Sequence, residues 1–173
     1  MAASATLDQT ARSFLIPSAR QEVLMEGPVG VVAKVWGEQT GGVISIVEHP
    51  VQPGVLVPPH THQDLDEWSY ILEGRIGARI GNEEFTAEPG DYVLKPRRIP
   101  HTFWNAGPGH ARLIEIITPA GFEHFFARLG EQIRSSGFDP AAVAELGAQY
   151  GTSYEMEWVP DLEERYGIKL MGT

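Results

Sequence analysis

The chain has 173 residues, no cysteine and a formal net charge of −10 with its histidines counted as neutral. The negative charge argues against nucleic acid or an anionic membrane surface as a partner, and the lack of cysteine leaves histidine and carboxylate as the strong metal ligands. No stretch approaches the ~20 apolar residues of a membrane helix, and residues 1–12 lack the apolar core of a secretory signal, so we expect a cytoplasmic protein.

Short strands are predicted after an N-terminal extension at residues 1–20. Apolar residues of one parity indicate a strand within residues 29–36. A second strand is expected over residues 43–48 and should break at His49, because Pro50 follows it. The turn signal at residues 53–54 then leads into a short apolar run at 55–57.

The next predicted strand, residues 67–72, is apolar on both faces. Trp68, Tyr70 and Leu72 form a row opposite the other parity of the strand. Such a row needs a cover, which could be another sheet, a helix or a second subunit. We expect a homodimer built on this row. The alternative cover is the N-terminal strand or the C-terminal helices of the same chain.

The rest of the strand pattern indicates a closed β structure over residues 21–118. A hairpin is expected from residues 75–80 and 84–87, and further strands at 92–95, 101–105 and 111–118. Short strands with turn signals every eight to twelve residues are typical of an antiparallel barrel or sandwich.

A helical segment is predicted over residues 119–173. Phe122, Phe125, Phe126 and Leu129 repeat at helical spacing, and Asp139 before Pro140 is typical of the start of a second helix. Residues 161–166 suggest a third short helix. We expect this segment to cover one mouth or flank of the β structure, and the whole chain, 1–173, to be one domain.

Two histidine clusters carry the chemistry. His60 and His62 are two residues apart, so on a strand they point to the same face and can bind one metal ion. Glu67 and His101 are the residues expected to provide the further metal ligands. Three nitrogens and one oxygen leave two positions free on an octahedral ion. The cofactor is therefore expected to be one divalent metal ion, with iron, manganese, nickel, cobalt and zinc all left open.

Alternation with these ligands also suggests a substrate pocket. The candidate wall residues are Ser69, Ile71, Phe103 and Asn105. Their alternatives are that Ile71 and Phe103 only fill the barrel and that Asn105 holds a turn. The remaining histidines lack the ligand spacing, and we interpret them as bystanders: His49, His110 and His124.

Both clusters resemble the two motifs of the cupin family. The first motif, with its spaced glycines, His-x-His and glutamate, is matched by Gly54, His60, His62, Glu67 and Gly74. The second is matched by Gly90, Pro96, His101 and Asn105, whereas Arg98 stands where the family usually has glycine. This departure puts only the local turn before His101 in doubt.

The resemblance implies a fold and a set of roles. A cupin domain is a double-stranded β-helix, or jelly roll, and residues 43–48 and 118–126 resemble single-domain cupins related to quercetin dioxygenases. In that group three histidines and one glutamate hold a divalent metal that binds a deprotonated flavonol hydroxyl, and dioxygen then opens the heterocycle. The resemblance implies His60, His62 and His101 as ligands and Glu67 as ligand and catalytic base.

We therefore expect a metal-dependent dioxygenase whose partners are dioxygen and a small hydroxylated aromatic or enolisable compound. One alternative is a non-redox isomerase or polyketide-type cyclase that uses the metal as a Lewis acid. The other is a cupin that binds a small molecule without turnover.

Overall fold

The computed structural model describes residues 15–172. Residues 1–14 of the expected extension lie outside the described residues. The strands are β1 (Glu22–Met25), β2 (Val31–Val35), β3 (Ser45–Val51), β4 (Val55–Leu56), β5 (His60–His62), β6 (Asp66–Glu73), β7 (Ile76–Ile80), β8 (Glu83–Ala87), β9 (Tyr92–Lys95), β10 (His101–Asn105), β11 (Ala111–Thr118), β12 (Thr152–Tyr154) and β13 (Lys169–Leu170). The α-helices are α1 (Glu123–Ser136), α2 (Pro140–Gln149) and α3 (Val159–Tyr166), with short 3₁₀ helices at Ser18–Arg20, Gly37–Thr40 and Met156–Trp158.

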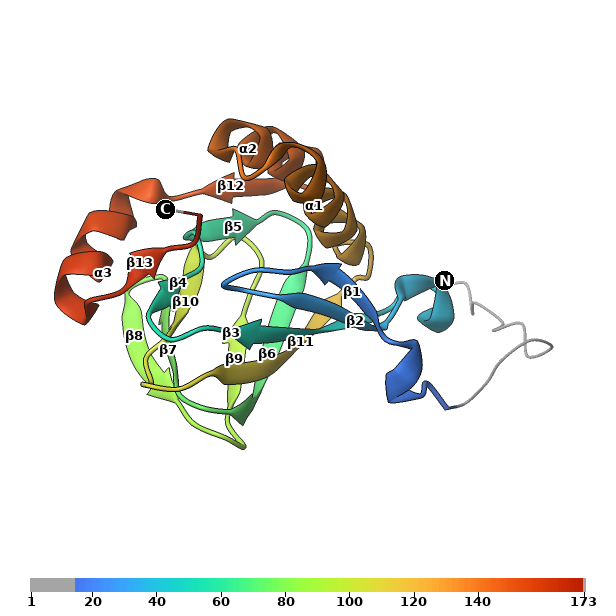
Figure 1. Ribbon diagram of the computed structural model, residues 1–173, viewed down its shortest axis with the longest axis horizontal. Coiled ribbons are helices and arrows are strands. Elements are labelled where there is room, and N and C mark those ends of the chain that lie inside the picture. Colours follow the sequence, from blue (N-terminus) through green and yellow to red (C-terminus); the bar gives the residue numbers. More distant parts are fainter. Residues whose placement is uncertain (1–14, 173) are drawn as a thin grey trace.

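The strands form two sheets that enclose the core, as Figure 1 shows. One sheet has the order β1-β2-β3-β11-β6-β9, and the other has the order β12-β5-β10-β4-β13, with β7 pairing to both β10 and β8. The long pairs β3–β11, β11–β6 and β6–β9 are antiparallel. This arrangement confirms the predicted jelly-roll barrel with C-terminal helices.

Strand register places polar residues on the inner face of the barrel. Glu67 of β6 lies opposite Lys95 of β9, and Ser69 of β6 lies opposite Glu115 of β11. Along β11 buried and less buried residues alternate, so Glu115 shares the inner face with Leu113 and Ile117. The centre of the barrel is thus charged although the strands around it are apolar.

The C-terminal helices cover two parts of the barrel (Figure 1). Phe125 and Leu129 of α1 pack against Leu24 and Met25 of β1 and close one mouth. Leu162 of α3 instead packs with other side chains on the flank of the second sheet, among them Leu56 and Trp104. The Asp139 side chain accepts a hydrogen bond from the Ala141 N–H at 3.0 Å, so the predicted start of α2 is confirmed. Within residues 15–172 there is no helix with the length and apolar character needed to span a membrane.

The predicted end of β3 at His49 is wrong. The strand continues through Pro50 to Val51. Proline lacks an N–H, but Pro50 lies beside Gly30, which is outside β2. The Pro50 carbonyl accepts a hydrogen bond from the Gly30 N–H at 2.8 Å. A Cβ on Gly30 would lie 2.7 Å from the Pro50 ring, so glycine allows this close approach. The longer strand carries His49 onto the inner face.

The apolar row on β6 remains open to solvent among the described residues. Trp68 is 44% exposed, and Leu94, its partner on β9, is 47% exposed. Tyr92, the β9 partner of Tyr70, is 65% exposed. The C-terminal helices lie elsewhere, so the alternative in which they cover this row is wrong.

Arg98 is the non-glycine residue of the described chain that has a positive φ, at 64°. Its N–H donates to the His62 carbonyl at 2.7 Å, which ties the turn before β10 to β5. The turn therefore needs the left-handed conformation that the cupin glycine would supply, and arginine adopts it at a cost of roughly 1–2 kcal/mol.

Replacing Arg98 with glycine is expected to raise the free energy of unfolding by about 0.5–1 kcal/mol, since part of the relief is offset by the greater freedom of glycine in the unfolded chain. Urea unfolding measures this change. Arg98→Ala is the control, because it removes the guanidinium contact with the Gln63 carbonyl but keeps the strained φ. Equal stabilities of the glycine and alanine variants would contradict the proposed backbone strain at position 98.

Candidate metal centre and cavity

Strands β5, β6 and β10 bring the four predicted ligands together. His60 and His101 are directly paired across β5 and β10, and Glu67 comes from β6 of the facing sheet. One ligand atom from each of His60, His62, Glu67 and His101 lies within 4.8 Å of the others. His62, Glu67 and His101 are each at most 3% exposed. Residues distant in the sequence therefore form one compact, buried donor set.

Each of the three histidines is oriented through its Nδ1 atom. In His60 this atom lies 2.7 Å from the Pro58 carbonyl, and in His101 it lies 2.9 Å from the Ile99 carbonyl. A carbonyl only accepts, so Nδ1 carries the proton in both rings and Nε2 keeps a free lone pair. In His62, Nδ1 lies 2.9 Å from the Thr152 hydroxyl. Partners of this kind fix metal-binding histidines in many proteins.

The donor set fits a divalent cation. His62 Nε2 and His101 Nε2 are buried and have no hydrogen-bond partner among the described residues. They lie 3.4 and 3.5 Å from the Glu67 carboxylate, without hydrogen-bond geometry. Burial, followed by repulsion from the neighbouring rings, holds the pKa of His60 well below its usual value. Neutral imidazoles and a carboxylate are the ligand types that such an ion needs, so the cluster could hold one.

A buried ion-pair network supports Glu67. The Lys95 Nζ lies 3.0 Å from Glu67 Oε2 and 2.5 Å from Glu115 Oε2, and the Ser69 hydroxyl donates to Glu115 at 3.0 Å. Lys95 and Glu115 were not among the site residues predicted from the sequence. The available signal was their parity, because each is a charged residue on the inward, apolar side of its strand.

Burial and charge act against each other in this network. Burial would raise the pKa of Glu67, but Lys95 and His62 outweigh it and hold that pKa well below the usual value. Burial raises the pKa of Glu115 to about 7 despite the nearby Lys95. Burial would lower the pKa of Lys95, but Glu115 and Glu67 raise it, so the ammonium stays charged. The centre thus holds an ionised Glu67.

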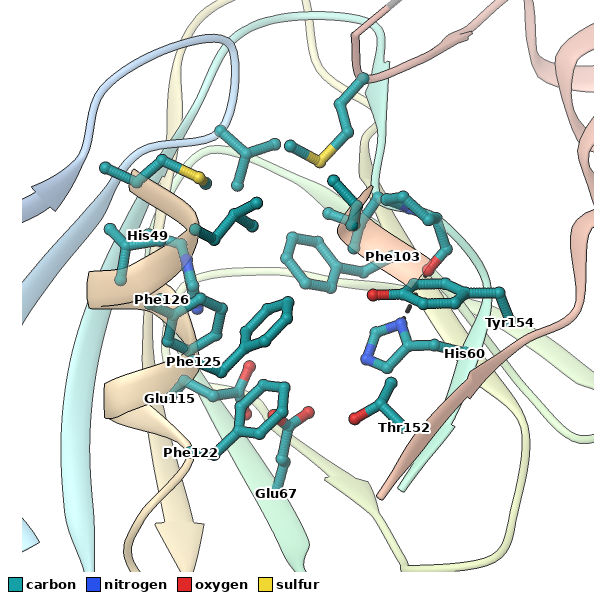
Figure 2. A pocket seen from close by; sticks show the side chains of 18 of the residues that line it. His49, His60, Glu67, Phe103, Glu115, Phe122, Phe125, Phe126, Thr152 and Tyr154 are labelled. Carbon is teal, nitrogen blue, oxygen red and sulfur yellow. Dashed lines mark hydrogen bonds between the residues drawn. The ribbon is translucent and has the colours of Figure 1, made fainter. Parts of the chain in front are cut away.

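The donor set opens into a cavity walled by aromatic rings. The space free of atoms is about 690 Å³, a volume that includes the open mouth and the solvent in it. Figure 2 shows Phe122, Phe125 and Phe126 from the α1 segment facing His60 and Tyr154. Helix α1 therefore completes the site as well as closing the barrel.

Of the four predicted pocket residues, one lines the cavity and three lie outside its lining. Phe103 lines the cavity, and its contact with a substrate stays a prediction. Ser69 is turned toward Glu115, and Ile71 is fully buried in the core, so neither belongs to the lining. Asn105 also lies outside the lining. Its amide donates to the Val51 and Gly109 carbonyls and its oxygen accepts from the Gly107 N–H, which holds the turn after β10.

The histidines outside the donor set differ from one another. His49 is 4% exposed and lines the cavity, although it lies outside the group of four ligand atoms. His110 is exposed. His124 forms a second acidic group with Glu38 and Glu123, but the Glu123 oxygens already accept from the Gly37 and Gly121 N–H groups at 2.8 and 2.7 Å. The Glu123 carboxylate therefore has a structural role, since it satisfies two backbone N–H groups.

His49 predicts a pH dependence of stability. Burial lowers the pKa of His49 from 6.5 to about 4. Between these values the unfolded chain binds a proton that the folded chain does not, so the free energy of unfolding falls as the pH drops. Glu115, with its pKa raised to about 7, acts in the opposite direction below pH 7.

The metal-free His49→Asn variant is expected to lose less stability than the wild type between pH 7 and 4.5, by on the order of 2 kcal/mol. Glu115 contributes to both proteins and cancels in this comparison. Urea unfolding at the two pH values measures the difference, with His110→Asn as the control. Parallel losses in all three proteins would contradict the expectation.

Parts of the chain are similar in sequence to known proteins. A family model described as "Cupin domain" matches residues 48–117. "Quercetin 2,3-dioxygenase" of Bacillus subtilis (strain 168) is 23% identical over 133 residues, which are 77% of this chain and 39% of that protein. "Tetracenomycin polyketide synthase protein TcmJ" of Streptomyces glaucescens is 30% identical over 80 residues, 46% of this chain and 52% of that protein. The chain thus spans about half or less of the length of these relatives.

A solved structure supports the fold. The structure of KdgF from Halomonas sp. matches with a TM-score of 0.56 at 18% identity, over 66% of this chain and 99% of that chain. At this identity the match describes the arrangement of the strands alone.

Proposed function

Because the chain belongs to the cupin superfamily, we propose that it is a metal-dependent dioxygenase acting on a small hydroxylated aromatic or enolisable compound. The observation that carries this proposal is the convergence of three histidines and a glutamate, with the buried Nε2 atoms of His62 and His101 unpaired, beside a cavity that His60, Glu67 and several phenylalanines line. Similarity to a protein named quercetin 2,3-dioxygenase supports the oxidative chemistry.

His60, His62, His101 and Glu67 are the proposed ligands of one divalent ion. Such an ion supplies Lewis-acid chemistry, since it lowers the pKa of a hydroxyl that it binds. Glu67 is also the proposed base, and Lys95 keeps it ionised and able to accept the hydroxyl proton. The phenylalanine wall packs on a flat substrate ring and excludes water from the reacting atoms.

Elemental analysis and an oxygen electrode test this function together. Protein purified without added metal should contain one divalent ion per chain, and after loading with iron, manganese, nickel or cobalt it should consume oxygen with 3-hydroxyflavone or a related enol. Product formed under argon would instead support a non-redox reaction. Neither result over a broad panel of hydroxylated compounds would support a binding protein.

The non-redox alternative is an isomerase or polyketide-type cyclase. It is favoured by the buried Lys95–Glu115 pair, which lines the same cavity and offers an ammonium and a carboxylate for proton transfers. The similarity to a polyketide synthase protein of Streptomyces glaucescens points in the same direction. Anaerobic turnover separates this alternative from the dioxygenase.

We also propose that a second copy of the chain covers the exposed row on β6. Light scattering at micromolar concentration should give the mass of a dimer, and Leu94→Glu should give a monomer because it places a charge beside Trp68. Phe85→Glu, at an exposed position on β8 of the other sheet, should stay dimeric. A monomeric wild type would contradict the proposed homodimer.

A further inference from the structure

A histidine outside the donor set lines the same cavity as the proposed metal ligands His60 and Glu67. His49 lies on β3, on the inner face with Ser45, Val47 and Val51. Its ring centroid lies 6.1 Å from that of Phe103 and 5.5 Å from that of Phe126, and both of these rings line the cavity. Figure 2 shows His49 beside Phe126 and apart from Glu67.

The hydrogen bonds of His49 fix its chemical form. Its Nδ1 atom lies 3.0 Å from the Gly30 carbonyl, which only accepts, so Nδ1 carries the proton. The ring is neutral, and Nε2 is therefore a hydrogen-bond acceptor. No residue between 15 and 172 donates to this atom. The orientation matches that of His60 and His101, but His49 is not part of the group whose ligand atoms lie within 4.8 Å.

An acceptor that faces a cavity without a protein partner can accept a hydrogen bond from a molecule bound there. Water would be one such molecule, but most of the residues that line the cavity are apolar, and the charged Lys95 and Glu115 in the lining are paired with each other. The apolar residues include Val29, Val31, Phe103 and Phe126. A hydroxyl carried on an apolar ring fits both the apolar wall and the free Nε2 acceptor of His49.

We propose that His49 Nε2 accepts a hydrogen bond from a hydroxyl of the substrate, remote from the oxygen that reaches the metal ligands. The substrate class is then a flat, largely apolar compound with polar groups at two places, an enol or phenol near Glu67 and a second hydroxyl near His49. His49 is a positioning residue that selects among such compounds. This inference rests on the proposed function, because it places the first group at the metal centre.

Binding without turnover tests the proposal. The protein is loaded with zinc and kept under argon, and the affinities of 3-hydroxyflavone and of its derivatives with one added hydroxyl are measured by fluorescence titration. In the wild type at least one added hydroxyl should improve the affinity tenfold or more. His49→Asn keeps a donor near Gly30 but removes the acceptor at the Nε2 position, so this gain, measured within the variant as the ratio of the two affinities, should disappear.

His49→Gln is the matched control, because its amide can place an oxygen near the Nε2 position and should retain most of the gain. A second readout uses the wild type alone. The ¹⁵N resonance of His49 Nε2 should shift when the favoured derivative is added and not when 3-hydroxyflavone is added. If no derivative shows a gain that depends on His49 and the resonance does not move, the proposal is wrong. Failure of 3-hydroxyflavone itself to bind would contradict the substrate class of the proposed function as well.

Discussion

Replacing His62 with alanine is expected to remove most of the bound metal. His62 contributes one of the three Nε2 atoms that face Glu67, and it is 1% exposed, so water replaces the lost ligand poorly. Its ring also packs on Phe122 at a centroid distance of 4.5 Å, and alanine leaves this contact unfilled. Elemental analysis after dialysis against a weak chelator should give well below half an ion per chain.

Two further variants separate a lost ligand from general damage. Thr152→Val removes the hydroxyl that contacts His62 Nδ1 and should weaken metal affinity roughly 10- to 100-fold, which is the usual effect of losing a partner that orients a ligand. His110→Ala, at an exposed position, should leave the metal content unchanged. A His62→Ala protein that is folded by circular dichroism and keeps one ion per chain would contradict this ligand set.

Replacing Lys95 with methionine is expected to destabilise the metal-free protein by roughly 3–5 kcal/mol, since it leaves two buried carboxylates without their cation. Lys95 is 2% exposed and contacts both Glu67 and Glu115. Urea unfolding of the metal-free protein measures the loss. Zinc should restore part of the stability, because an ion bound by Glu67 compensates one of the two carboxylates.

A double variant tests whether the buried charge causes this loss. Lys95→Met combined with Glu115→Gln removes one of the two charges and keeps an acceptor for Ser69, so it should recover at least half of the lost stability. Lys169→Met is the control. Lys169 pairs with Glu163 at 3.6 Å, but its side chain is 77% exposed, so its loss should cost no more than ~1 kcal/mol. A Lys95→Met protein as stable as the Lys169→Met protein would contradict the role of the network.

The four proposed ligands and the barrel could be predicted from the sequence because local spacing encodes them. His60 and His62 share a face by strand geometry, and the strands at residues 92–95, 101–105 and 111–118 have the bounds that their alternation indicates. Arg98 was identified as a departure from the second cupin motif, and its φ of 64° shows that this position requires a left-handed backbone conformation.

What the sequence did not indicate depends on contacts between distant segments. His49 was assigned to a strand end because Pro50 follows it, yet the Gly30 turn accommodates the proline and keeps His49 in the strand. The short strand β12 pairs along its whole length with β5, where Thr152 lies opposite His62. Such pairings leave no periodic signal in the chain, since they are set by packing and not by local propensity.

The central claim is that side chains from three strands hold one cation inside the barrel. A crystal grown with manganese or zinc and measured at the absorption edge of that metal tests this claim most directly. We expect one strong anomalous peak in contact with the Nε2 atoms of His60, His62 and His101 and with a Glu67 carboxylate oxygen. A peak at Glu38, Glu123 and His124 instead, or no peak within the barrel, would contradict the account.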